Sequence, residues 1–274
     1  MIQIQGNKLE KSGEYSMEKP SGLGRTYVIS DVHGCYDQFI QLLEKIKFSD
    51  KDRLILLGDL VDRGPHSCKL LRFVMPSPNI YPILGNHDYF AYKNLRWLTS
   101  TFSADSTKKI DRDSVEIFFE WVKEGGESTV NEFRMLNGNQ RQQIIEFLSE
   151  FYFYKELTVN ERKFVLVHAG IENFQRNKPM IDYEFYDLIF EHPNYQVEYF
   201  PDRFLVTGHT PTRIIRKLVG QSNNDGSDDL IFRTHHHIAI DSGCVYGGRL
   251  AALCLDDLSE YYVDGPNVHG GDGI

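Results

Sequence analysis

The sequence predicts an α/β fold in which two mixed β-sheets pack face to face, with helices outside and a helical insertion at one side. In the first half of the chain, β-branched runs alternate with amphipathic stretches, the pattern of β-α-β units. In the second half, short strands follow one another with little but turns between them. An alternating half followed by a meandering half fits two packed sheets.

The first half contains three predicted strands, and a polar cluster follows each of them. Strand 26–30 (TYVIS) runs into DVHG, strand 53–57 (RLILL) into GDLVDRG, and strand 79–84 into GNHD. Apolar residues at helical spacing in 36–48 predict a crossover helix, and Pro65 is well placed to begin a second one. Ligands bind where the carboxyl ends of such strands meet, so we expect the three clusters at one edge.

A helical insertion is predicted at about 90–151, where several amphipathic segments follow one another. Its aromatic residues Phe118, Phe119 and Trp121 lie at helical spacing, so we assign them to the core and not to a cofactor site. An insertion between polar clusters is expected to shape the substrate entrance and not to perform chemistry.

The second half begins with a predicted hairpin, formed by residues 152–157 and 163–167, that enters the second sheet. Its second strand ends at His168, and a short strand at 204–207 ends just before His209. Two more imidazoles are therefore expected at strand ends.

Length and composition limit the possible classes of protein. The 274 residues are expected to form one domain at 25–264, with flexible tails at 1–24 and 265–274. A net charge of -9 argues against nucleic acid as a partner. No apolar run reaches the ~20 residues that span a bilayer, and no signal peptide is visible, so we expect a cytoplasmic monomer without membrane contact. The four separated cysteines are interpreted as reduced thiols.

The polar residues at strand ends form the ligand inventory of two metal ions. They comprise two carboxylates, one amide and three imidazoles: Asp31, His33, Asp59, Asn86, His168 and His209. Mixed oxygen and nitrogen donors suit manganese, iron, zinc or cobalt better than calcium, and we expect manganese to serve in vitro. One carboxylate must be shared between the two metal ions, and the central Asp59 is the natural bridging ligand. Ions so bridged lie ~3.5–4 Å apart, hold a hydroxide between them and favour in-line displacement at phosphorus.

Five motifs, in this order, resemble those of the phosphoprotein phosphatase branch of the calcineurin-like metallophosphoesterases: SDVHG, GDLVDRG, GNHD, VHAG and GHT. The resemblance covers about 26–256 and implies an αββα sandwich. Bacterial members also have segments similar to WVKEGG at 121–126 and DSGCVYGGRL at 241–250.

The resemblance also implies roles for individual residues. Asp31, His33 and Asp59 would bind one metal, and the second would be bound by Asp59, Asn86, His168 and His209. His87 would be the general acid, oriented and kept protonated by Asp62, and Arg63 would hold the phosphoryl oxygens.

The chain departs from the family pattern in one respect. A second phosphate-binding arginine is usual before the GHT motif, but the corresponding stretch reads DLIFEH, so His192 or Arg176 is a possible substitute. Tyr246 lies near the family's active-site tyrosine in an ambiguous alignment, and we leave it out of the catalytic set. The run 235–237 (HHH) is assigned to a strand, since neighbouring strand residues point to opposite faces.

Three functions are weighed. The leading one is a serine/threonine protein phosphatase, acting on a phosphorylated protein. The alternative is hydrolysis of diadenosine tetraphosphate or a related nucleotide, by enzymes that tend to have a small residue where this chain has Asp62. The third is a non-catalytic scaffold, which is disfavoured because no ligand position is lost.

Overall fold

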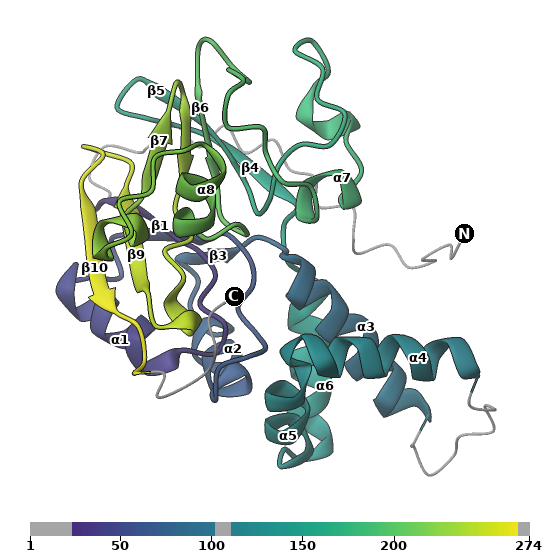
Figure 1. The fold of residues 1–274 in the computed structure, drawn as a ribbon. Coiled ribbons are helices and arrows are strands. Elements are labelled where there is room, and N and C mark those ends of the chain that lie inside the picture. Colours follow the sequence, from purple (N-terminus) through teal and green to yellow (C-terminus); the bar gives the residue numbers. More distant parts are fainter. Residues whose placement is uncertain (1–23, 102–110, 268–274) are drawn as a thin grey trace.

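The computed structural model describes residues 24–101 and 111–267, and shows two five-stranded β-sheets (Figure 1). The predicted tails lie almost entirely outside the described residues. The first sheet has the order β10-β9-β1-β2-β3. Its strands are β1 (Thr26–Ile29), β2 (Arg53–Leu56), β3 (Ile80–Pro82), β9 (Arg249–Cys254) and β10 (Glu260–Asp264). β1, β2 and β3 run parallel, whereas β9 is antiparallel to both β1 and β10.

The second sheet has the order β4-β5-β6-β8-β7. Its strands are β4 (Tyr154–Val159), β5 (Arg162–Val167), β6 (Phe204–Thr207), β7 (Phe232–Thr234) and β8 (His237–Ala239). The hairpin β4–β5 opens the sheet, and β5, β6 and β8 are parallel. Both sheets are mixed, as the sequence predicts, and the predicted fold class is confirmed.

Side-chain alternation explains how the two sheets pack. In β1, Val28 belongs to the apolar cluster shared with the second sheet, while its neighbours Tyr27 and Ile29 belong to the cluster shared with helices. In β2, Ile55 belongs to the cluster shared with the second sheet, and Leu54 belongs to the cluster shared with helices. Because successive strand residues face opposite sides, continuous apolar runs are what a sheet covered on both faces requires.

Helices cover the outer faces. α1 (Tyr36–Lys45) and α2 (Ser67–Val74) pack against the first sheet, and α8 (Thr212–Leu218) places Ile215 against the second. Pro65 precedes α2 and is not its first residue, contrary to the sequence prediction, since the loop after β2 stays irregular as far as His66.

The helical insertion lies to one side of the sheets in Figure 1. It comprises α3 (Asn86–Thr101), α4 (Arg112–Trp121), a π-helical turn (Val122–Gly126), α5 (Glu127–Arg134) and α6 (Gly138–Leu148). The GNHD motif thus enters α3 directly, and the insertion begins earlier than residue 90. Between β5 and β6, residues 171–201 contain only a 3₁₀ turn (Met180–Asp182) and the short α7 (Tyr186–Ile189). Among the described residues, no helix is long and apolar enough to cross a membrane. A cytoplasmic monomer stays a prediction.

Candidate metal centre

Loops at one edge of the sheets bring the predicted site residues together. Asp31 and His33 follow β1, Asp59 follows β2, and Asn86 begins α3 soon after β3. From the second sheet, His168 directly follows β5 and His209 comes soon after β6. Carboxyl ends of parallel strands meet at this edge, which is why motifs far apart in sequence converge.

The backbone of these loops is unusual. Six of the nine predicted site residues have positive φ: Asp31, His33, Asp59, Asp62, Arg63 and His209. Each such residue costs about 1–3 kcal/mol and persists only where its surroundings dictate the conformation. Concentrated backbone strain of this kind is typical of functional sites.

Asp88 supplies part of this constraint. Its buried carboxylate accepts hydrogen bonds from the backbone N–H groups of Asp59 (2.7 Å), Leu60 (2.9 Å) and Gly85 (3.0 Å). Gly85 is needed here because a Cβ at that position would lie 2.2 Å from an Asp59 oxygen. Asp88 therefore joins two motif loops, a role that sequence reasoning missed.

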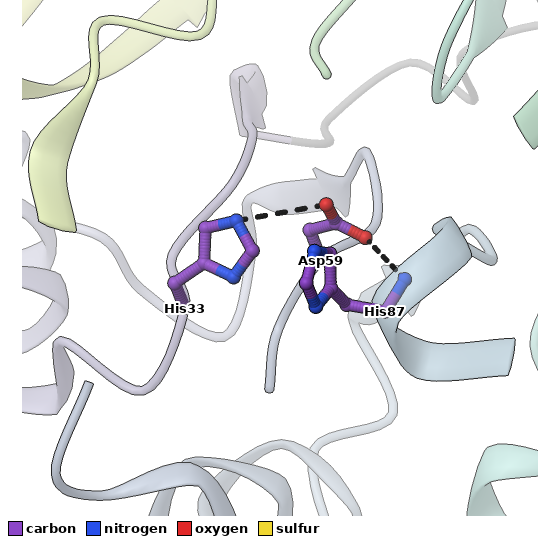
Figure 2. Close-up of side chains that lie close together, drawn as sticks. All are labelled: His33, Asp59 and His87. Atoms are coloured by element: carbon purple, nitrogen blue, oxygen red, sulfur yellow. Dashed lines mark hydrogen bonds and ion pairs between the residues drawn. The ribbon is translucent and has the colours of Figure 1, made fainter. Parts of the chain in front are cut away.

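Asp59 lies at the centre of the site. Figure 2 shows its carboxylate between His33 and His87, with one oxygen 3.6 Å from His33 Nε2 and the other accepting the His87 backbone N–H at 3.0 Å. Among the described residues, two groups have ligand atoms within 4.8 Å of one another: His33, Asp59 and His87, and Asp59, His168 and His209. Asp59 belongs to both, as a bridging ligand must.

Hydrogen bonds fix the imidazoles for coordination. His33 Nδ1 lies 2.8 Å from the Val61 carbonyl oxygen, and His168 Nδ1 lies 2.6 Å from that of Leu57. A carbonyl accepts only an N–H, so both rings carry the proton on Nδ1 and keep a lone pair on Nε2, the nitrogen that lies 3.6 Å (His33) or 3.5 Å (His168) from an Asp59 oxygen. This arrangement is usual for metal-binding histidines.

Asn86 and Asp31 lie beside the two groups. Asn86 Oδ1 is 3.0 Å from His168 Nε2 and 3.1 Å from His209 Nδ1, so it joins the second group. The Asp31 carboxylate accepts the His209 backbone N–H at 3.0 and 3.2 Å and belongs to neither group. The first group contains His87 where the sequence predicts Asp31.

The electrostatics of the site fit metal ions. Burial lowers the pKa of His33 and His168, and burial together with His168 lowers that of His209 to about 3. Neutral imidazoles are the form that metals bind. Burial and the neighbouring Asp241 and Asp59 carboxylates raise the pKa of Asp31. Buried carboxylates at such short range are stabilised by a cation, so the donor set fits divalent ions.

Next to the two groups, Asp62 holds His87. The carboxylate is fully buried, and His87 Nδ1 lies 2.8 Å from its Oδ2 atom. Two residues of the insertion complete its hydrogen bonding: Trp121 Nε1 donates to Oδ2 at 2.7 Å and the Thr129 hydroxyl to Oδ1 at 2.6 Å. The orienting role of Asp62 stays a prediction, and this contact with His87 is the geometry that the role requires.

Arg63 projects toward the same centre. Its Nη1 atom lies 2.5 Å from His33 Nε2, and its guanidinium lies 5.3 Å from the centre of the Tyr246 ring. The insertion contacts this residue too, because Gly125 O accepts the Arg63 backbone N–H at 2.9 Å. Gly125 has φ +112°, and a Cβ there would lie 2.6 Å from Arg63 Cγ. The Gly-Gly turn of WVKEGG thus permits the insertion to contact Arg63.

A family model for calcineurin-like phosphoesterases matches residues 24–239. The chain belongs to this family. It is therefore a hydrolase of phosphoric esters, as the sequence motifs predict.

This calcineurin-like phosphoesterase is similar in sequence to bacterial bis(5'-nucleosyl)-tetraphosphatases. The asymmetrical bis(5'-nucleosyl)-tetraphosphatase PrpE of Halalkalibacterium halodurans is 29% identical over 257 residues, covering 84% of this chain and 90% of the relative. The symmetrical bis(5'-nucleosyl)-tetraphosphatase of Salmonella paratyphi C is 35% identical over 148 residues, but covers only 53% of this chain and 43% of the relative.

Solved structures share the fold. One, provisionally assigned as a diadenosine tetraphosphatase, has a TM-score of 0.59 at 20% identity and covers 90% of this chain and 96% of its own. A serine/threonine phosphatase from Saccharomyces cerevisiae has a TM-score of 0.51 at 14% identity, covering 90% of this chain and 81% of its own. At these identities the likeness concerns the fold alone.

Sequence reasoning missed or left open several residues of this phosphoesterase. Trp121 is buried, as predicted, but its indole N–H reaches into the site, and Thr129 gave no sequence signal. The assignment of Phe119 to the core is wrong, because its side chain is 56% exposed. His192 lies beside His209, with ring centres 4.8 Å apart. Arg176 instead lines a separate pocket with Glu156, so His192 is the nearer candidate for the unassigned phosphate-binding role.

The run 235–237 is only partly in a strand. His237 begins β8 and is buried, whereas His235 and His236 form the turn that precedes it, because the β7–β8 hairpin reverses direction there. The strand assignment is wrong for His235 and His236. None of the three belongs to a metal-binding group in the described part of the chain.

Proposed function

We propose that this phosphoesterase hydrolyses bis(5'-nucleosyl) tetraphosphates at a dinuclear metal centre. The supporting observation is the similarity to tetraphosphatase PrpE, which extends over 84% of this chain and 90% of that enzyme. This proposal reverses the order of functions that the sequence motifs alone favoured.

Two divalent ions would be held around Asp59. His33 would contribute on one side, where the family resemblance also assigns Asp31 although it lies outside the first group, and Asn86, His168 and His209 would contribute on the other. Such ions supply positive charge that neutralises the phosphoryl group and prepares a water molecule for attack. We keep manganese as the first ion to test.

His87 would donate the proton to the leaving oxygen. Its Nδ1 atom is bound to Asp62, so Nε2 is the nitrogen available for this transfer. Without a donor the leaving group would depart as a strong base, which matters most for poor leaving groups. Arg63 would bind phosphoryl oxygens through its planar fork of N–H donors.

One observation favours the second candidate, a serine/threonine protein phosphatase. The family resemblance associates an aspartate at position 62 with protein phosphatases, and here Asp62 is buried with hydrogen bonds to His87, Trp121 and Thr129. This position therefore has a defined structural role whichever substrate is used.

Phosphate or nucleotide release from diadenosine tetraphosphate and from a phosphoserine peptide, measured side by side with manganese, tests the proposal. Turnover of the dinucleotide supports it. Turnover of the peptide alone would reject it in favour of the protein phosphatase.

A further inference from the structure

A pocket of about 670 Å³ opens directly beside the candidate metal centre. Arg63 and His87 line it, together with residues of α3, α4, the π-helical turn and the segment that carries Phe190. This volume lies within the roughly 300–1,000 Å³ of typical small-ligand pockets. The pocket therefore joins the phosphoryl-handling residues to a space large enough for a further part of the substrate.

The position of His87 relates this pocket to the leaving group. A general acid must lie within hydrogen-bond reach of the leaving oxygen. His87 lines the pocket, and because its Nδ1 atom is bound to Asp62, Nε2 is the nitrogen left for a leaving oxygen. A substrate aligned with this acid extends its leaving group into the pocket.

One face of α3 forms a wall that leads away from the metal centre. Asn86, Phe90 and Lys93 are spaced by four and three residues, so they lie on one side of the helix, and all three line the pocket. Seven residues of helix span about 10 Å. Moving outward, a ligand therefore meets first the metal centre, then an aromatic ring and finally an ammonium group.

Phe190 enlarges the aromatic part of this wall. It lies at the end of α7, and its ring centre is 5.8 Å from that of Phe90, with an angle of 64° between the planes. Both side chains are half-buried, so part of each ring remains available. Two such rings offer a surface on which a nucleobase can stack.

The charges of the pocket suit an anionic ligand. Neither Lys93 nor Lys123 forms an ion pair with another described residue, and with Arg63 they give three cations. Two exposed glutamates, Glu120 and Glu124, line the pocket as well. The net charge of these five side chains is therefore +1, and the pocket adjoins a site that is expected to hold metal ions.

We propose that this pocket binds the nucleotide that leaves, with its base against Phe90 and Phe190 and its phosphates near Lys93 and Lys123. The inference rests on the proposed function and adds to it the residues that select a nucleotide. A small phosphomonoester would reach Arg63 and His87 but not the outer wall.

The first test compares kcat/KM for diadenosine tetraphosphate with that for p-nitrophenyl phosphate. Lys93→Gln and Phe190→Leu should each lower the ratio of the two values about tenfold or more, since stacking and charge are lost only for the larger substrate. Arg96→Gln is the matched control, because Arg96 lies on the same helix but lines a different pocket. It should leave the ratio unchanged.

The second test needs no turnover. ATP binding to the metal-free protein can be followed by fluorescence, because Trp121 lines the pocket. ATP should bind at least tenfold more tightly than inorganic phosphate, and both pocket variants should weaken it about tenfold. Wild-type cleavage of the dinucleotide with unchanged ratios in both variants would overturn the pocket assignment alone. Absence of cleavage by the wild type would overturn the proposed function and this inference together.

Discussion

Replacing Asp62 by asparagine separates the charge of this residue from its shape. The Asp62 carboxylate is fully buried and receives hydrogen bonds from His87, Trp121 and Thr129 at 2.8, 2.7 and 2.6 Å. An amide oxygen can still accept from His87 and Trp121, while the amide N–H₂ can donate to the Thr129 hydroxyl. The variant should therefore fold, and His87 should keep its orientation.

The expected cost is the difference between a charged and a neutral hydrogen bond. Charged ones contribute about 1.5–3 kcal/mol and neutral ones about 0.5–1.5 kcal/mol, so protonated His87 loses roughly 1–1.5 kcal/mol. That corresponds to about a tenfold lower rate. The loss should be seen with phenyl phosphate, whose leaving group needs a proton, and should be less than about twofold with p-nitrophenyl phosphate.

The assay is kcat for both esters at saturating manganese, with metal content measured on the same samples. Asp228→Asn is the matched control, because Asp228 also accepts three hydrogen bonds, from Ser222, Asn223 and Asn224, but lies away from the site. Equal slowing of both esters by Asp62→Asn, with both metals still bound, would refute the assignment of His87 and Asp62 as acid and orienting carboxylate.

Three further predictions concern the metal centre and the core. Asp59→Asn should reduce metal content below two ions per chain by mass spectrometry; an unchanged content of two would contradict the bridging role. Gly85→Ala should displace Asp59 and lower metal content and activity at least tenfold, whereas Gly138→Ala, where a Cβ meets nothing within 4 Å, should change neither. Burial lowers the pKa of His237 to about 3 from an ordinary 6.5. Below pH 6.5 this imidazole therefore takes up a proton in the unfolded chain but not in the folded protein. Stability is therefore lost as pH falls below 6.5. Relative to His237→Leu, metal-free wild type should lose about 2 kcal/mol between pH 6.5 and 5 in urea titrations, and parallel curves would disprove this.

Much of this protein could be predicted from local patterns. The apolar runs around Val28 and Ile55 are buried on both faces, and strands of that kind have a recognisable composition. The motifs that follow them are short and contiguous, so Asp31, Asp59 and Asn86 could be assigned to one edge without coordinates. The carboxyl ends of parallel strands meet at one edge of a sheet, so the position of the site and the fold class could be predicted from the sequence.

What remained hidden depends on contacts between distant segments. Trp121 and Thr129 lie 59 and 67 residues from Asp62 in sequence, and nothing in their neighbours indicates that they bind it. From the sequence we expected the insertion to take no part in the chemistry. In the structure, the insertion completes the hydrogen bonding of Asp62 and contacts Arg63.

The motifs alone determined the family and the predicted set of metal ligands, because strand ends present these residues in a fixed order. Only the tertiary structure decided which side chains hold His87 in place, and which surface extends from it. Phe90 and Phe190 come from segments 100 residues apart and form one aromatic wall only because α3 and α7 pack together. Packing of this kind is set by the complementary shapes of whole elements, which no short stretch of sequence records.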